Sequence, residues 1–167
     1  MSLDKVDDLV ENWAEFASKT KLKHLQRSEK IEKATLVVFN LFDHEYALVI
    51  DEVKEIISIP HIIPIPQTPD YIVGLGNVRG NVLALLDLNY RVFKESSGKN
   101  EYVVVLKSNE LKLGLLVNKM PETFTLEKSM LNYSSAAIKS LSKEDDFIKG
   151  LVKKDERIIF LMDTKKL

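Results

Sequence analysis

The sequence predicts a mostly β protein in which two small closed barrels of five strands each follow one another along the chain, behind an N-terminal helix. From residue 35 onward, short segments rich in Val, Ile and Leu alternate with polar turns, which is typical of β-strands. Five such segments occur in each half, and closing them into a barrel would remove the exposed edges of short strands. The second half also repeats the first. A β-sandwich is the alternative architecture.

Residues 1–34 are expected to form a helical extension. Apolar residues recur every three or four positions and would share one helix face: Val6, Leu9, Val10, Trp13, Phe16 and Ala17. Acidic residues near the start and basic residues further on follow the order that the helix dipole favours. The apolar stripe thins after Phe16, which leaves a break or fraying near residues 19–21 open. The face either docks on the chain's own body or binds a partner or a second copy, and both readings stay open.

The first module, barrel one, is expected at about 35–94. Its strands are expected at 35–42, 45–50, 55–59, 71–78 and 81–86. Asp43 and His44 mark the first hairpin turn, and Arg79 and Gly80 mark the last. One connection holds four prolines, whose missing N–H donors disfavour a regular strand: Pro60, Pro64, Pro66 and Pro69. We expect this connection to be an extended, stiff strap.

The second module, barrel two, is expected at about 95–167, so that the strand domain as a whole covers 35–167. Its strands are expected at 101–107, 111–117, 122–126, 146–152 and 157–162. The counterpart of the proline strap is longer, 127–145, and contains a helix-like patch at 136–141. A polar linker at 93–100 joins the two modules.

The internal repeat covers most of the two modules. Three pairs of segments correspond without gaps: 71–87 with 147–163 at a separation of 76 residues, 46–53 with 113–120 at 67, and 36–39 with 102–105 at 66. Gly74 thereby falls on Gly150, and Asp87 falls on Asp163. Two copies of a unit this long indicate two packed modules rather than a solenoid, whose short repeats need several copies to bury a core.

Composition excludes several classes of function. A chain of 167 residues that is 45% hydrophobic can bury a real core. Its 24 basic and 25 acidic residues give a net charge of −1, which argues against a generic nucleic-acid binder. The absence of cysteine excludes disulfides, thiolate metal sites and a cysteine nucleophile. No stretch approaches the roughly 20 apolar residues of a membrane span, and the start lacks a signal-peptide pattern, so we expect a cytoplasmic protein.

Catalytic patterns are weak. His24, His44 and His61 fall in the helix, a hairpin turn and the proline strap, without the spacing of a zinc helix, so we expect no metal site and no cofactor. Asp87 and Asp163 each follow an apolar strand, a layout similar to that of a two-lobed aspartic hydrolase. The Asp-Thr/Ser-Gly sequence of such a site is missing, however. We therefore expect each aspartate to cap the turn or helix that follows it.

The hairpin turn Asn77-Val-Arg-Gly80 differs between the two copies. Gly80 can supply unusual backbone angles, and the side chain of Asn77 can bond to neighbouring main chain. The second copy has Lys153-Lys-Asp-Glu156 at this place. The module therefore does not need this turn for its structure, and Arg79 is a candidate for a functional rather than a structural residue.

These residues give the chain a resemblance to the CheW family of chemotaxis coupling proteins. Asn77-Val-Arg-Gly80, the apolar strand after it and Asp87-Leu88 are similar to the Asn-Leu-Arg-Gly…Asp-Leu signature of that family. Three further segments agree: 46–56, 69–74 and 148–163. The resemblance implies two SH3-like barrels around a shared core. It also implies a non-catalytic, cytoplasmic adaptor, recruited to membrane receptor arrays, that joins chemoreceptors to the CheA histidine kinase.

The resemblance also implies two binding surfaces. Receptor binding would involve Arg79 and, in a groove between the barrels, Ile50, Glu55 and Tyr102. The kinase's own CheW-like domain would pack around Val53 and Gly74, where a charge or a bulky side chain is expected to weaken binding without disturbing the fold. Two other functions are left as alternatives, a nucleic-acid-binding SH3-like protein and the aspartic hydrolase.

Overall fold

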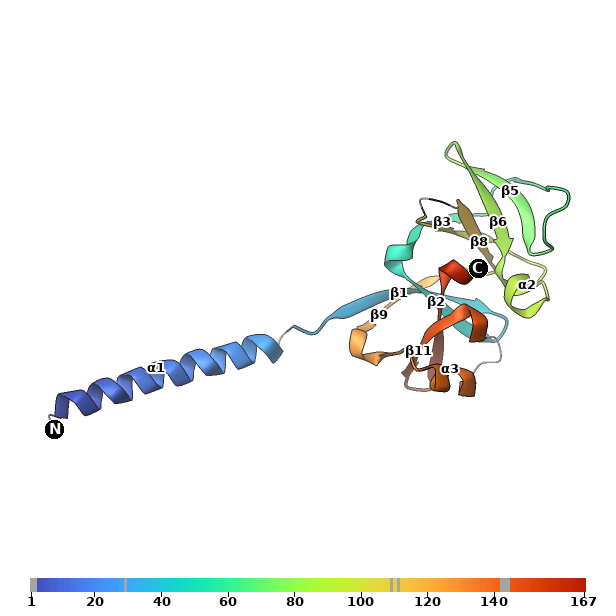
Figure 1. Ribbon diagram of the computed structural model, residues 1–167. Coiled ribbons are helices and arrows are strands. Elements are labelled where there is room, and N and C mark those ends of the chain that lie inside the picture. Colours follow the sequence, from blue (N-terminus) through green and yellow to red (C-terminus); the bar gives the residue numbers. More distant parts are fainter. Residues whose placement is uncertain (1–2, 29, 109, 111, 142–144) are drawn as a thin grey trace. The chain divides into compact units, whose positions relative to one another are not determined.

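A helix and a strand domain form two separate units of the chain. The computed structural model describes residues 3–28, 30–108, 110, 112–141 and 145–167. Contacts divide the chain into Met1–Glu32 and Lys33–Leu167. The first unit is one helix, α1 (Leu3–Ser28), which continues without a break across residues 19–21 (Figure 1). No helix in the described part of the chain is long and apolar enough to cross a membrane.

Among its described residues the second unit contains twelve strands, two short helices and four short 3-10 turns. The strands are β1 (Lys33–Leu41), β2 (His44–Val49), β3 (Val53–Ser58), β4 (Ile62–Ile63), β5 (Ile72–Val78), β6 (Asn81–Asp87), β7 (Tyr102–Leu106), β8 (Leu113–Val117), β9 (Glu122–Glu127), β10 (Leu131–Asn132), β11 (Ile148–Lys154) and β12 (Arg157–Met162). The helices are α2 (Leu88–Phe93) and α3 (Ser135–Leu141), and the 3-10 turns are η1 (Ile50–Glu52), η2 (Lys128–Met130) and η3 (Asp145–Phe147), with a fourth, η4 (Thr164–Lys166), at the C-terminal end.

The predicted fold class, mostly β with an N-terminal helix, is confirmed. Each expected strand matches an observed one to within about two residues at most ends, although Leu111, at the start of one of them, lies outside the described residues. The proline strap contains one short strand that was not expected. Ile62 and Ile63 pair with Gly76 and Leu75, because the prolines flank these two residues and leave their N–H groups free.

The strands form two six-stranded sheets that do not follow chain order. Sheet A has the order β10-β11-β12-β2-β1-β9, and sheet B has the order β3-β7-β8-β6-β5-β4. Each half of the chain therefore gives its first two strands to the sheet of the other half. The expected boundary between barrels near residue 94 is wrong for this reason, since β1 and β2 belong with β9–β12, and β7 and β8 belong with β3–β6.

The internal repeat is visible in this exchange. Strand β2 runs parallel to β12, and β8 runs parallel to β6, at equivalent registers: Tyr46 faces Phe160, and Leu113 faces Ala84. The bulge at Gly74 opposite Leu85 recurs at Gly150 opposite Leu161. The registers within β1–β2 and β7–β8 place Leu36 in the position of Val103, one residue away from the pairing with Tyr102 that the sequence alignment gave.

Three apolar clusters hold the sheets together. One lies inside sheet A and includes Leu36 and Val38, and one lies inside sheet B and includes Val103 and Val105. The third and largest cluster contains the residues that alternate with these along the strands, such as Val37 and Val104, and it is shared by the two sheets. Because side chains alternate along a strand, β1 and β7 are buried on both faces, which explains their unbroken apolar runs.

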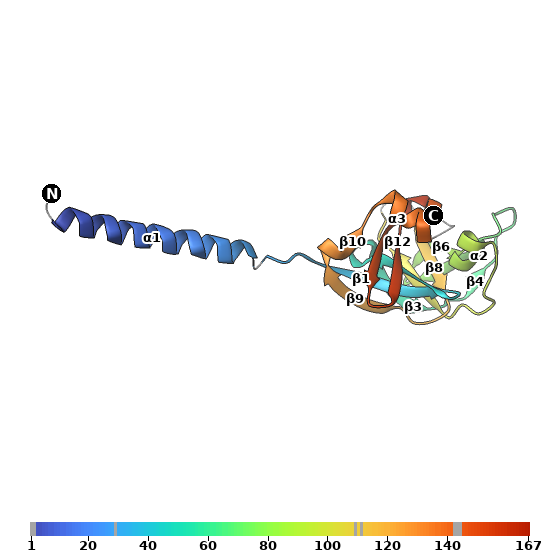
Figure 2. The same ribbon diagram turned by 90° about the horizontal axis from the view of Figure 1, so that it is seen from below.

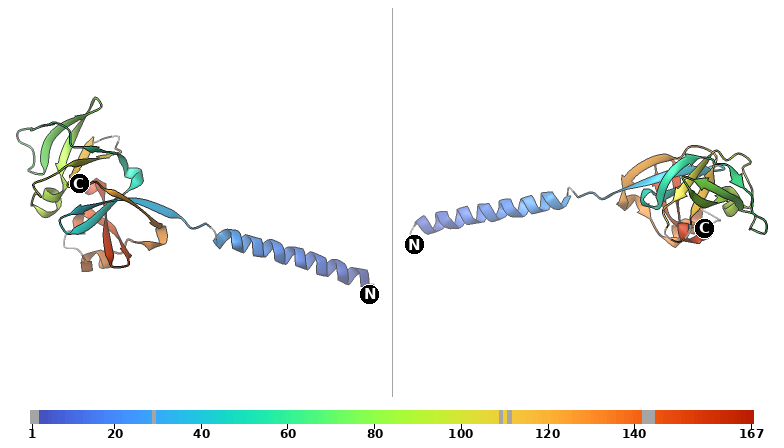
Figure 3. Two further views of the ribbon diagram at one scale, coloured as in Figure 1. Left: turned by 180° about the vertical axis from the view of Figure 1, so that it is seen from behind. Right: turned by 90° about the horizontal axis from the view of Figure 1, so that it is seen from above.

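The short helices and the C-terminal end close this structure. Helix α3 packs on β11 (Figure 2). The C-terminal residues lie on the strand domain (Figure 3), where the Arg91 guanidinium of α2 donates hydrogen bonds of 3.3 Å to the backbone oxygens of Lys166 and Leu167. Leu167 also packs partly against the shared core.

Candidate protein-binding surfaces

The turn between β5 and β6 presents Arg79 to solvent. Val78 and Asn81 close the hairpin, and the Gly80 N–H donates a 3.0 Å hydrogen bond to the side-chain oxygen of Asn77. Arg79 has a left-handed backbone conformation with φ of 53°. Its side chain is 78% exposed, and one guanidinium nitrogen lies 3.3 Å from a carboxylate oxygen of Glu55. An exposed ion pair of this kind contributes little to stability, so a partner can compete for either charge.

The equivalent turn between β11 and β12 has the same backbone feature with different side chains. Asp155 takes the position of Arg79, with φ of 56°, between the paired residues Lys154 and Arg157. The left-handed position therefore belongs to the module, while the Asn-x-Arg-Gly sequence does not. This supports the expectation that Arg79 is not needed for the turn itself.

The other predicted receptor-binding residues lie at different places along and before β3. Glu55 of β3 pairs with Arg79, and Tyr102 begins β7 opposite Ser58 at the far end of β3. Ile50 opens η1, the segment that leads into β3, and is 40% exposed. Arg79 and Glu55 are thus in direct contact, whereas Ile50 and Tyr102 form no hydrogen bond or ion pair with them among the described residues.

A recess of about 430 Å³ is lined by residues of η1, of the ends of β7 and β8, and of the C-terminal end. Its lining includes Glu52, Lys107 and Thr164. The Glu52 carboxylate accepts hydrogen bonds there from the Lys149 ammonium (3.3 Å) and the Thr164 hydroxyl (3.1 Å). None of the predicted receptor-binding residues lines this recess.

Val53 and Gly74, the residues predicted for kinase binding, are buried. Val53 is 8% exposed and belongs to the shared core. A β-carbon on Gly74 would lie 2.4 Å from the Ile63 carbonyl oxygen. The expectation that a charge at Val53 or a bulky side chain at Gly74 leaves the fold intact is therefore wrong, because a charge would enter the core and a side chain would displace β4. A role of this region in kinase binding has to be tested at its exposed residues.

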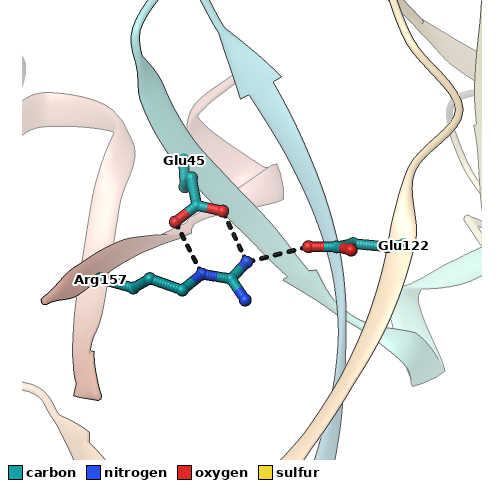
Figure 4. A network of polar contacts seen from close by, with 3 residues as sticks. All are labelled: Glu45, Glu122 and Arg157. Carbon is teal, nitrogen blue, oxygen red and sulfur yellow. Dashed lines mark hydrogen bonds and ion pairs between the residues drawn. The ribbon is translucent and has the colours of Figure 1, made fainter. Parts of the chain in front are cut away.

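Sheet A carries a bidentate ion pair that the sequence did not reveal. Arg157 of β12 donates to both carboxylate oxygens of Glu45 on β2, at 3.1 and 2.6 Å, and to Glu122 of β9 at 2.9 Å (Figure 4). The hydrogen bonds to the two glutamates raise the pKa of the Arg157 guanidinium above its ordinary value. The arginine balances one of the two glutamate charges, so the network as a whole stays negative.

The two aspartates considered for catalysis have the predicted structural role. One carboxylate oxygen of Asp87 accepts the backbone N–H of Tyr90 at the start of α2, and the other accepts the Ser96 hydroxyl at 2.7 Å. Asp163 caps η4 by accepting the backbone N–H of Lys165. Among the described residues no group of three His, Cys, Asp or Glu side chains could hold a metal ion.

The fold is a β scaffold: two sheets that exchange strands, one of which carries an exposed arginine turn. A family model described as the CheW-like domain matches residues 35–167, and the chain belongs to that family of chemotaxis scaffold proteins. The match covers the whole of the strand domain except its first two residues.

Relatives agree with this assignment. The chemotaxis protein CheW of Klebsiella aerogenes is 28% identical over 133 residues, which cover 78% of this chain and 79% of that protein. The chemotaxis protein CheW of Helicobacter pylori is 22% identical over 166 residues, which cover 98% of this chain and 96% of that protein. The crystal structure of the scaffolding protein TtCheW from Thermoanaerobacter tengcongensis superposes with a TM-score of 0.70 at 24% identity, over 81% of this chain and 88% of that one, and it shows the shared fold.

Proposed function

We propose that this chain is a non-catalytic adaptor that couples chemoreceptors to the CheA histidine kinase, in the cytoplasm at membrane receptor arrays. Membership of the CheW-like family supports the class of function. The observation that carries the proposal is the Arg79 turn, whose arginine is exposed, forms an ion pair with Glu55, and has no counterpart in the equivalent turn of the second module. The capping roles of Asp87 and Asp163 support the non-catalytic part.

The receptor surface comprises Arg79, Glu55, Ile50 and Tyr102. The first two supply a charged pair that a partner can open, and Ile50 supplies exposed apolar area. A polar rim around a small apolar patch is typical of modest, reversible protein contacts. A guanidinium group suits such a contact because its planar donors can bond two acceptors of a partner at once.

The proposed kinase surface consists of the exposed residues beside Gly74, at the β4–β5 edge of sheet B, because Val53 itself faces the shared core. Two exposed apolar residues stand there, Ile63 of β4 at 61% and Val73 beside Gly74 at 37%. The register places Asn132 and Lys149 at the equivalent positions of sheet A. The same strand edge is therefore apolar in one module and polar in the other, which favours an apolar partner surface on sheet B alone.

Calorimetric titration of the chain with a receptor cytoplasmic fragment, and separately with the kinase, tests the proposal. Both are expected to bind the wild-type chain. Ile63→Asp is expected to weaken kinase binding, because a charge would be desolvated in the contact, while the matched Asn132→Asp leaves it unchanged. The proposal is contradicted if neither protein binds, and the kinase surface is wrong if both variants bind the kinase as wild type does.

A further inference from the structure

Sheet B ends in a basic groove with an apolar floor. The groove has a volume of about 460 Å³ and lies between β3, β6, β7 and the residue that precedes β8. Its floor is formed by buried residues of β6 and β7, and its rim by three exposed lysines: Leu83, Val105 and Leu106, with Lys54, Lys107 and Lys112. No acidic residue lines it.

The equivalent place in sheet A holds an internal network of ion pairs. The strand registers align Lys112 with Glu45, Asn81 with Arg157, and Glu55 with Glu122. In sheet A these positions form the Glu–Arg–Glu network (Figure 4).

In sheet B the central position is an asparagine, whose side-chain oxygen accepts one 3.3 Å hydrogen bond from the Lys112 ammonium. The Glu55 carboxylate forms its ion pair with Arg79 instead. The sheet B counterpart of the Glu45 carboxylate is therefore the Lys112 ammonium, and the counterpart of the Arg157 guanidinium is an uncharged amide.

In the described part of the chain, the three lysines of the groove, Lys54, Lys107 and Lys112, are not held in ion pairs. The chain as a whole has a net charge of −1, so this concentration of charge is local. Three like charges around one groove repel each other, and a bound anion would relieve that repulsion.

We propose that this groove binds an acidic segment of a partner protein, with carboxylates on the lysine rim and aliphatic stems on the apolar floor. The buried leucine and valine side chains below the rim favour a glutamate-bearing peptide over a small inorganic anion, which would leave that floor uncovered. The groove adjoins the Arg79 turn through Asn81, but its lining contains none of the residues proposed above for receptor or kinase binding. The inference therefore holds independently of which proteins those partners are.

Fluorescence anisotropy with a short labelled peptide that alternates glutamate and leucine tests this site. The groove variant replaces Lys54, Lys107 and Lys112 with Gln. The matched control replaces Lys99, Lys119 and Lys139, which are also exposed and lie outside the groove, so that both variants lose the same charge. The wild type and the control are expected to bind at low salt, while the groove variant loses about tenfold or more in affinity, since three exposed ion pairs are removed. Thermal melts check that both variants fold.

Four results would overturn the proposal. The wild-type chain fails to bind the peptide at low salt, or the control loses as much affinity as the groove variant. A peptide with glutamine in place of glutamate binds equally well, which would remove the role of charge. Inorganic phosphate displaces the peptide at a concentration where chloride of equal ionic strength does not, which would make the groove a phosphate site.

Discussion

Arg79 and Asp155 occupy one left-handed position in two equivalent turns. For a residue with a β-carbon this conformation costs on the order of 1 kcal/mol relative to glycine, and aspartate tolerates it better than arginine does. A turn that keeps an arginine there gains nothing in local stability. The stability of the hairpin therefore does not explain the arginine, which agrees with the receptor-binding role proposed for it.

The equivalent glycines at the two bulges allow a direct test of residue-level packing. Gly74→Ala should destabilise the protein by about 2–4 kcal/mol, because its β-carbon would lie 2.4 Å from a backbone oxygen of β4 and its φ is 154°. Gly150→Ala should cost less than about 1 kcal/mol. Its β-carbon would meet the Tyr133 ring at 3.1 Å, and that ring is 60% exposed and can move. Urea denaturation measures both values, and equal destabilisation would contradict this account.

At this scale the sequence singled out one candidate site residue and left others hidden. Comparing the two copies was enough to single out Arg79, because the rest of the hairpin matches so well. The burial of Val53 could not be predicted from the sequence, since an apolar residue at the start of a strand can face either the core or the solvent. The basic groove was missed because Lys54, Lys107 and Lys112 are far apart in the chain and are joined only by the sheet.

Helix α1 is the element whose role is least tied to the rest of the fold. Four apolar side chains of its predicted stripe, Leu9, Val10, Trp13 and Phe16, are between 62% and 71% exposed, and the rings of Trp13 and Phe16 lie 5.9 Å apart. Val6 belongs to the part of α1 whose side chains lie outside the described residues. Whether this face docks on the strand domain or binds a partner stays a prediction.

Deleting residues 1–32 should leave the strand domain folded, with its thermal midpoint changed by less than about 2 °C. The three described apolar clusters contain no residue of α1, so the deletion removes nothing from them. Deleting residues 164–167 is the matched control. It removes Leu167 and the two acceptors of Arg91, and should lower the midpoint by about 4–8 °C. Differential scanning calorimetry compares the two. A large loss on removing α1 would show that it supports the core.

The strands themselves were predictable because local sequence determines them. Apolar runs of five to seven residues between polar turns located every long strand, and Asp87 before α2 gave a correct helix cap. The alignment of β1 with β7 was wrong by one residue because both are runs of similar apolar residues buried on two faces, so that neither face marks the register.

At the scale of the whole molecule, the exchange of strands could not be predicted. Strand β2 can pair with β6 or with β12, and both offer an apolar strand of the same pattern, so the sequence supports either choice. In the structure β2 pairs with β12 and β8 pairs with β6, both in parallel, so the strands are exchanged between the two halves. The two halves of the chain are thereby joined through the shared core and through both sheets.

Separate expression of residues 33–94 and 95–167 tests this exchange. The first fragment lacks β7 and β8 of sheet B, and the second lacks β1 and β2 of sheet A. Each should therefore be largely unfolded alone, without a cooperative thermal transition. Mixed in equal amounts, the fragments should form a complex with the β-sheet content of the intact domain, because each supplies the strands that the other lacks. Two fragments that fold cooperatively on their own would contradict the exchange and restore the boundary near residue 94.

The account rests on the claim that this chain bridges a receptor and a kinase, and one bridging experiment tests it most directly. Kinase immobilised on beads is incubated with receptor cytoplasmic fragments in the presence of the wild-type chain, Arg79→Ala or Asp155→Ala. The wild type and Asp155→Ala should retain the receptor on the beads. Arg79→Ala should stay bound to the kinase but lose the receptor, by on the order of 1–3 kcal/mol in receptor affinity. Receptor retention without the chain, or equal retention by all three forms, would contradict the account.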